Sequence, residues 1–388
     1  MRRARFYFIA ALLVLPSLAA HAQAKQGNNS IRVCVLKNVA SLKLTLDGRY
    51  AIYSLQNNEV IKAGKSLYKV TVNAVDDGLM LGKTPLQCDT IKVSPDKDGR
   101  VYIDRWRFRG EVDIIKANDL TLIVVNELDV EDYLYGVLYH EVSHRWPAEV
   151  LKAQAIAART YALYQKKMMA GKDYHVTADV YSQVYGGRAS EKFSTNRAVD
   201  ATRGKVLTFN GDIFPAYYHA TCGGFTEDAS NLWKTDLPPL KGVACGFCTR
   251  SKHFHWTRKI RMSYIAEVLQ KAGYPITGVS SIKIESRNPS HRINNVIITG
   301  PGGETAIPGK DFRIAIGPNL LRSNNYDVIV DRDIVVFNGI GWGHGVGMCQ
   351  WGAYFMARKG YKAKQILQYY YPGAEVRDYH APDSSTTS

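Results

Sequence analysis

Short apolar runs alternate with turn signals over the first part of the chain. The runs are rich in β-branched residues or alternate with polar ones, and they cover residues 31–36, 68–73, 101–103 and 120–125. Asp-Gly pairs at residues 47–48, 77–78 and 98–99 separate them. This pattern is typical of strands joined by turns. We therefore expect a β-rich region over residues 31–110, to which the sequence assigns no role.

The periodicity changes at Asp129. Apolar residues at 134, 137 and 138 have helical spacing and predict a short helix whose end lies near Glu141. A second helix is expected from Pro147 to about Ala170, because proline suits the first turn of a helix and Gly171 suits its end. Alanines at 153, 155, 157, 158 and 162 let other elements approach closely, so this helix is predicted to be central.

The remaining pattern is mixed. We expect a strand over 205–209, helices over 262–272 and 349–359, and a β-rich stretch over 281–335. The fold class predicted is α+β, with mixed β-structure around the Ala-rich helix and an additional N-terminal β-rich region. The expected domains are residues 31–110 and a catalytic domain over residues 111–375, followed by a disordered tail at 381–388.

The first 24 residues have the features of a signal peptide. Three arginines precede a short apolar run from Phe6 to about Ala20, and small residues follow it. The run is too short to span a bilayer comfortably, and no later stretch is long and apolar enough, so we expect a cleaved, exported chain without a transmembrane helix. We expect it in the periplasm, in the cell envelope or secreted.

The chain is basic, with a formal net charge of +15. The arginines of the signal peptide account for three of these charges, and the remainder would attract anionic polymers or lipid surfaces. Lys/Arg runs interleaved with aromatics and zinc-finger spacing are both absent from the sequence. We therefore predict no nucleic-acid partner.

Two charged residues stand out as candidates for chemistry. Glu141 follows the first predicted helix and precedes Trp146, and partial desolvation there would raise its pKa into the range of a general acid. Arg159 lies inside the Ala-rich helix, where a buried guanidinium needs an acidic or ligand partner. It would either form a structural salt bridge, orient Glu141, or hold a substrate carboxylate.

A third candidate site combines cysteine and histidine. Cys222 follows His219, and the pair Cys245 and Cys248 precedes His253. Three thiolates and one histidine have the composition of a closed, structural zinc site, with His219 or His253 as the fourth ligand. A disulfide with one thiol left over is the alternative, because export favours oxidation.

A glycine-rich segment lies near the end of the chain. Glycines at 339, 341, 343, 345 and 347 flank Trp342 and His344, so the backbone there could approach a ligand closely. The segment is not a nucleotide-binding loop, because no Lys-Ser/Thr pair follows it.

In order along the chain, these pieces resemble the stage II sporulation protein D (SpoIID/LytB) family. The resemblance covers about residues 100–375 and rests on residues 125–137 (VNELDVEDYLYGV), Glu141, 146–162 (WPAEVLKAQAIAARTYA), 183–187 (QVYGG), 219–224 (HATCGG) and 341–353 (GWGHGVGMCQWGA). Two departures are Val142-Ser143, where Met-Pro is usual, and Cys349, where serine is frequent.

The resemblance implies an exported lytic transglycosylase that acts on peptidoglycan glycan strands, in particular strands stripped of their stem peptides. It places the family's catalytic glutamate at Glu141 and the family's arginine at Arg159. It also implies zinc bound in the region from His219 to Cys248. Substrate contacts are expected from Tyr185, Tyr218, Trp342, His344 and Gln350. The rival interpretation is a non-catalytic glycan-binding protein, or an enhancer of a cell-wall amidase.

Overall fold

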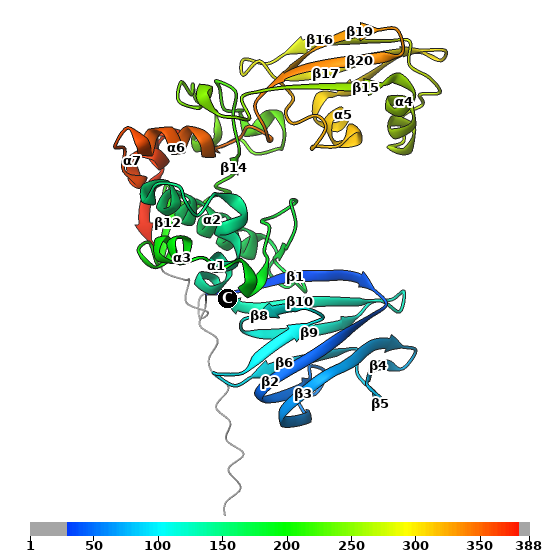
Figure 1. Ribbon diagram of the computed structural model, residues 1–388, viewed down its shortest axis with the longest axis vertical. Helices are drawn as coiled ribbons and strands as arrows, with labels where there is room; N and C mark the ends of the chain where they lie inside the picture. The colour runs from blue at the N-terminus through cyan, green and yellow to red at the C-terminus, as the bar shows by residue number, and fades with distance from the viewer. Residues whose placement is uncertain (1–28, 380–388) are drawn as a thin grey trace, which may run out of the picture.

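The computed structural model describes residues 29–379, and the expected signal peptide and C-terminal tail lie outside this range (Figure 1). The fold is mixed α and β, as predicted. Within the described residues, no helix is both long and apolar enough to cross a membrane.

The N-terminal part is one mixed sheet. Its strands are β1 (Ser30–Val39), β2 (Ser41–Ser54), β3 (Val60–Val75), β4 (Gly78–Leu81), β5 (Thr84–Leu86), β6 (Thr90–Pro95), β7 (Arg100–Ile103), β8 (Trp106–Phe108), β9 (Glu111–Lys116), β10 (Leu122–Asp129) and the short β11 (Val176–Thr177). Along β2, Leu42, Leu44 and Leu46 are buried while Ser41, Lys43 and Asp47 are exposed. One face therefore forms the core. The sheet continues across residue 110, the expected boundary, through β10 to Asp129, and β11 adds a later edge strand.

The middle of the molecule is helical. It contains α1 (Val130–Glu141), α2 (Ala148–Met168), α3 (Phe193–Asp200), α6 (Gln350–Arg358) and α7 (Ala363–Tyr370), the 3-10 turns η1 (Gly187–Ser190) and η2 (Ala229–Asn231), and a small sheet of β12 (Lys205–Phe209), β13 (Asp212–Ile213) and β22 (Glu375–Asp378). The alanines at 153, 155, 157, 158 and 162 of α2 are buried, so this helix is central, as predicted.

A third part inserts between these helices in the sequence. It holds the sheet of β15 (His255–Arg261), β19 (Tyr326–Asp331) and β20 (Ile334–Ile340), the sheet of β16 (Ser281–Arg287), β17 (Ile293–Gly300) and β18 (Gly303–Pro308), and the helices α4 (Met262–Lys271) and α5 (Gly309–Ile316). The turns η3 (Pro238–Leu240) and η4 (Cys248–Arg250) precede it. We call residues 255–340 the inserted part.

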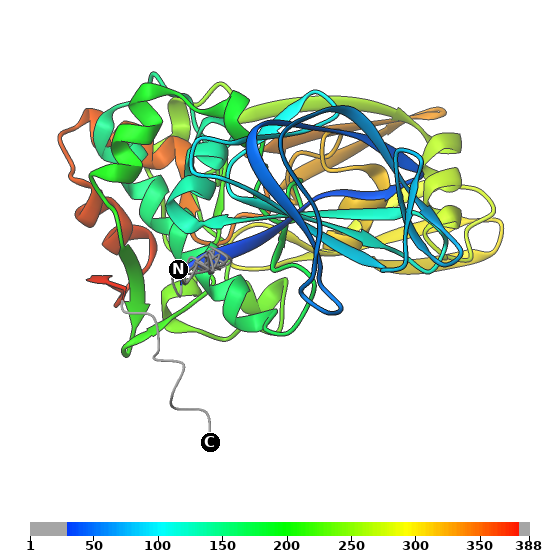
Figure 2. The same cartoon turned by 90° about the horizontal axis from the view of Figure 1, so that it is seen from below.

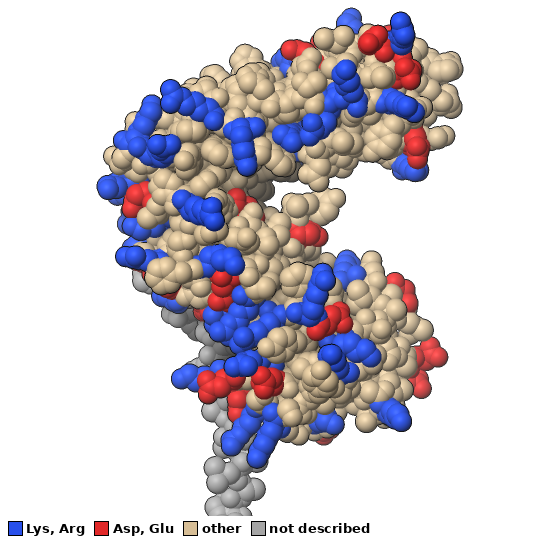
Figure 3. All heavy atoms as spheres, viewed as in Figure 1, with Lys and Arg blue, Asp and Glu red and all other residues tan. Residues whose placement is uncertain are grey.

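The inserted part and the N-terminal sheet lie at opposite ends of the molecule, with the helices between them (Figure 1). From below, the helices of the middle part gather on one side, and the N-terminal sheet and the inserted part overlap on the other (Figure 2). The surface view shows a hollow between the two ends and Lys and Arg side chains over all three parts of this face (Figure 3).

A buried ion pair joins the first two helices. Arg159 of α2 donates from Nε and Nη2 to the two carboxylate oxygens of Glu131, at 2.8 and 2.6 Å. The guanidinium also donates to the Lys205 and Val199 carbonyls, and Glu131 accepts from the Gly204 amide. The three guanidinium nitrogens of Arg159 and both carboxylate oxygens of Glu131 therefore have hydrogen-bond partners. A buried ion pair is tolerated when its polar atoms are satisfied in this way.

We predict that Glu131→Gln destabilises the protein by about 3 kcal/mol or more, because Arg159 would remain charged and buried without its counterion. The control is Glu267→Gln, which removes an exposed pair with Lys271 on α4 and should leave the free energy of unfolding nearly unchanged. Urea unfolding followed by circular dichroism measures both. Equal destabilisation by the two substitutions would contradict the structural role of this pair.

Candidate active site

Glu141 is the last residue of α1, at the opposite end of this helix from Glu131. Asp129 caps the start of α1 by accepting from the Glu131 amide at 2.8 Å, and the two acidic residues of the first turn suit the positive end of the helix. The helix ends at Val142, which has an extended backbone. Glu141 therefore leaves the helix where the chain turns toward α2.

The carboxylate of Glu141 receives hydrogen bonds from three neutral groups. They are the backbone amide of Val184, the hydroxyl of Tyr218 and the side-chain amide of Gln350. These donors come from a loop, from β14 (Tyr218–His219) and from the first turn of α6. The fold thus brings three segments far apart in sequence to one carboxylate, and none of these partners is acidic.

Burial raises the pKa of Glu141 from 4.5 to about 7. Loss of water disfavours the charged form, while the hydrogen bonds from Val184, Tyr218 and Gln350 partly offset this effect by stabilising the carboxylate. A carboxyl group with a pKa near neutrality can both give and take a proton. A raised pKa from desolvation agrees with the sequence analysis, and the role of Glu141 as a general acid stays a prediction.

A buried relay positions Tyr218. The Tyr133 hydroxyl donates to Gln183 Oε1 at 3.1 Å, and Gln183 Nε2 donates to the Tyr218 hydroxyl at 2.8 Å. The Tyr218 hydroxyl is then left with its proton to donate to Glu141. On the other side, Gln350 Nε2 lies 3.4 Å from Gln154 Oε1 of α2. Sequence reasoning missed the roles of Tyr133, Gln183 and Gln154, because only the fold brings these residues together.

The structure brings two of the five expected substrate-contacting residues, Tyr218 and Gln350, to Glu141. Tyr185 is buried beneath α1 and donates to Asn126 Oδ1 at 2.9 Å. His344 accepts from the Val346 amide through Nδ1 and lies 3.0 Å from the Tyr218 carbonyl through Nε2. Burial lowers the pKa of His344 to about 3, so it is neutral and holds the backbone of β14. The contacts of Tyr185 and His344 are thus with the protein itself, and both residues stabilise the elements that surround Glu141.

Arg159 makes its hydrogen bonds with Glu131 and two carbonyls, and it is fully buried. These contacts match the structural salt bridge among the roles considered from the sequence. They do not join Arg159 to Glu141.

Partly exposed aromatic rings lie near α6. Trp342 packs edge-on against His253 at 4.7 Å between ring centroids, and Arg322 lies over the Trp342 ring at 4.7 Å. The row continues through Trp351, which contacts both His253 and Trp146. Trp342 and His253 therefore belong to an aromatic surface that links the inserted part to the residues flanking Gln350.

Four cysteines form one buried group. The Sγ atoms of Cys222, Cys245, Cys248 and Cys349 all lie within 4.8 Å of one another. The first three were expected together. The expected histidine is not the fourth member, because His219 Nδ1 is directed to the Val346 carbonyl at 3.0 Å and His253 packs on Trp342. Cys349 takes this place because β21 (Met348–Cys349) pairs in parallel with β14, close to Cys222.

The cysteine group has the donors and the spacing of a tetrahedral thiolate site. Zinc–sulfur bonds of about 2.3 Å place tetrahedral ligands about 3.8 Å apart, which agrees with four sulfurs inside 4.8 Å. Cys349 Sγ also accepts from the Cys222 and Gly352 amides at 3.2 and 3.3 Å, the second of these at the start of α6. Such donors stabilise a thiolate. The residues present therefore fit a metal ion.

Comparison with known proteins decides the family. The chain is 32% identical to stage II sporulation protein D of Bacillus subtilis, in an alignment that covers 66% of this chain and 76% of the relative. Residues 118–209 match the family described as stage II sporulation protein. The chain belongs to the stage II sporulation protein D family. The predicted resemblance is confirmed.

Two further relatives extend the comparison. An uncharacterized protein of Brachyspira hyodysenteriae is 36% identical over 91% of this chain and 94% of its own length. The amidase enhancer of B. subtilis is 28% identical over 63% of this chain and 40% of its own length. Residues 244–347 match a domain of unknown function. In this member of the SpoIID family, that match spans the inserted part, Cys245 and Cys248.

We predict that Tyr218→Phe raises the pKa of Glu141 above about 7, because a hydrogen bond that stabilises the carboxylate is lost. Carbon-13 NMR of labelled glutamate across a pH titration measures this. Tyr181→Phe is the matched control, since Tyr181 is 85% exposed, and should leave the titration unchanged. A lower pKa of Glu141 in the Tyr218→Phe protein would contradict the proposed donor.

Proposed function

We propose that this protein is a peptidoglycan lytic transglycosylase that cuts between N-acetylmuramic acid and N-acetylglucosamine in glycan strands, with peptide-stripped strands as the substrate class. The observation that carries this proposal is the Glu141 carboxyl group, held by three neutral donors with a pKa of about 7. The family membership and the amidase-enhancer relative support a role at the cell wall.

In the proposed reaction Glu141 acts twice. Its carboxyl proton passes to the glycosidic oxygen as the bond from that oxygen to muramic acid C1 breaks. The C6 hydroxyl of the same muramic acid then forms a bond to C1 and gives its proton to the Glu141 carboxylate. The products are a 1,6-anhydro-muramic acid end and a free 4-hydroxyl, and the enzyme returns to its starting state.

One carboxylate is enough for this reaction because the substrate supplies the nucleophile. Glycosidases that use water or a covalent intermediate need two carboxyl groups on either side of the bond. The direct partners of Glu141 are an amide, a phenol and a carboxamide, and this neutral environment suits a single acid and base. Tyr218 and Gln350 orient the carboxyl group and remain near the leaving oxygen.

A second candidate function is an enhancer that binds glycan strands while a partner amidase cuts. The relative named amidase enhancer favours it. The two functions differ in their products, because only a transglycosylase leaves anhydro ends without a partner enzyme.

We predict that Glu141→Gln folds normally and loses strand cleavage by roughly a hundredfold or more, because glutamine cannot transfer a proton. Purified strands stripped of peptides are digested and the anhydro sugars are counted by mass spectrometry. Glu149→Gln is the matched control on the neighbouring helix and should keep activity. Release of anhydro products by Glu141→Gln at the wild-type rate would refute the assignment of Glu141.

The pH dependence follows from the same group. The acid form is present below pH 7, so kcat/KM should fall about tenfold per pH unit above about pH 7 as Glu141 loses its proton. The free energy of unfolding should also fall as pH rises, because the pKa of Glu141 is raised from 4.5 to about 7 in the folded protein. A raised pKa in the folded state means that the stabilisation conferred by the protonated form is lost as pH rises through about 7. A rate that keeps rising from pH 7 to pH 9 would contradict the role as acid.

We propose zinc as a structural ion of the four cysteines. Four protein ligands leave no open position for water, so the ion would supply folding energy and fix β14 and α6, which carry Tyr218 and Gln350. We also propose that the chain works outside the cytoplasm, where peptidoglycan lies, as its first residues predict.

We predict about one zinc per chain in protein purified without added metal, and little in Cys349→Ser. His253→Gln is the control and should retain the metal, because this side chain packs on Trp342. Elemental analysis with thiol counting under denaturing conditions checks both. Disulfides among these cysteines with no bound metal would defeat the zinc assignment and leave the role of Glu141 intact.

A further inference from the structure

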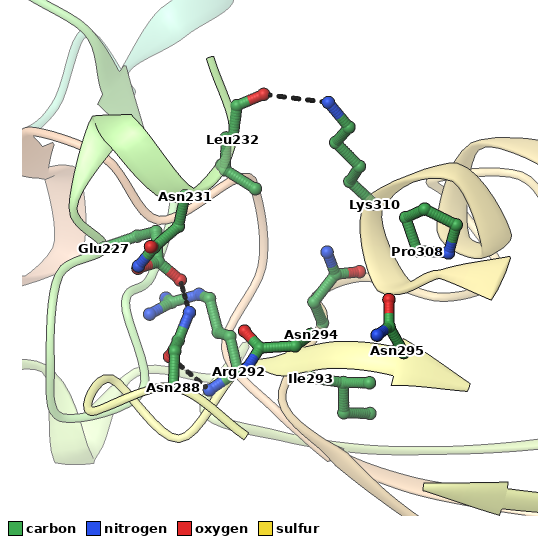
Figure 4. A pocket seen from close by; sticks show the side chains of 11 residues that line it. Glu227, Asn231, Leu232, Asn288, Arg292, Ile293, Asn294, Asn295, Pro308 and Lys310 are labelled. Atoms are coloured by element: carbon green, nitrogen blue, oxygen red, sulfur yellow. Dashed lines mark hydrogen bonds between the residues drawn. The ribbon is translucent and has the colours of Figure 1, made fainter. Parts of the chain in front are cut away.

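A polar pocket of about 240 Å³ lies where the helical part meets the inserted part. One wall is the segment around η2 and the other is built from β17, the end of β18, and α5 (Figure 4). Among the residues that line it are Asn231, Leu232, Arg292, Ile293, Lys310 and Asn324.

Two buried polar atoms in the lining have no hydrogen-bond partner among residues 29–379. They are Oδ1 of Asn324, which is 8% exposed, and Nε of Arg292, which is 2% exposed. The other guanidinium nitrogens of Arg292 donate to the carbonyls of Cys222 and Phe225. A buried polar atom without a partner costs about 1–3 kcal/mol. A ligand that pairs with these atoms would recover that cost.

The free groups of the pocket include donors and acceptors together. Lys310 Nζ donates to the Leu232 carbonyl at 3.1 Å and has two more protons to donate (Figure 4). Asn231 donates through its nitrogen to Glu227, which leaves the Asn231 oxygen as an acceptor. An inorganic anion would use only the donors and a metal ion only the acceptors. Hydroxyl groups both donate and accept, and so does an acetamido group.

The size and the apolar part of the lining also fit a sugar ring. The pocket lies just below the range of about 300–1,000 Å³ that is typical of sites for drug-sized ligands. Leu232, Ile293 and Pro308 add apolar surface to which the C–H face of a pyranose ring can pack.

We propose that this pocket is a second carbohydrate subsite that binds one N-acetylated sugar of the glycan strand, a role that rests on the substrate class of the proposed function. Contacts connect it to the catalytic region. Leu232 is followed by Trp233, which stacks on Tyr217 at 4.4 Å and is 37% exposed, and Tyr217 precedes Tyr218. The pocket would hold a strand away from the bond that is cut and increase affinity for long strands.

The test measures binding of an N-acetylglucosamine tetramer to the full chain with Glu141→Gln, by isothermal titration calorimetry. In this background, Asn324→Leu removes the unpaired acceptor at nearly constant volume and Lys310→Ala removes the amine. Each should weaken binding by at least fivefold. Lys283→Ala, on exposed β16, is the matched control and should leave Kd unchanged. If Asn324→Leu fails to fold, Lys310→Ala still decides the outcome.

Unchanged Kd in folded Asn324→Leu and Lys310→Ala would overturn the proposal. Binding of a peptidoglycan stem peptide that is lost in Lys310→Ala, with tetramer binding unaffected, would also overturn it. Failure of the proposed transglycosylase function can be distinguished from failure of the proposed subsite. If wild-type protein releases no anhydro products but the two variants still weaken tetramer binding, the subsite stands and the transglycosylase assignment falls.

Discussion

The ion pair between Glu131 and Arg159 is the interaction on which the candidate site depends. It fixes the first turn of α1 to the middle of α2, and through the Lys205 carbonyl and the Gly204 amide it also fixes the start of β12. Glu141 lies at the other end of the same α1 helix. A charge buried near one end of the helix therefore sets the position of the proposed catalytic carboxyl group at the other end.

Fully buried Arg159 and partly buried Glu141 show two ways in which the fold takes a charged group out of water. Arg159 is paired with Glu131 in bidentate fashion, so its charge is compensated by a counterion. Glu141 has only neutral partners, so the cost of burial appears as a raised pKa. One pKa unit corresponds to about 1.4 kcal/mol, so the site keeps Glu141 at some cost in stability. That cost is expected where a group must exchange a proton near neutral pH.

Local sequence signals were sufficient for the elements around the site. Helical spacing with a proline start predicted α2, and the periodicity at 134, 137 and 138 placed the end of α1 near Glu141. Partners distant in sequence could not be predicted. Cys349 is separated from Cys222 by 127 residues, and the pairing of β14 with β21 in the fold brings them together. The sequence analysis expected only β-structure over 281–335 and missed α5, where Phe312 and Ile316 are buried against the sheet.

The central claim is that Glu141 uses a hydroxyl of the substrate as the nucleophile. Digestion of peptide-stripped strands by the wild-type protein in water enriched in oxygen-18, followed by mass spectrometry, tests this most directly. The account predicts 1,6-anhydro-muramic acid ends that carry no oxygen-18. Reducing ends labelled with oxygen-18 would show hydrolysis, and intact strands would show binding without cleavage. Either result would contradict the account.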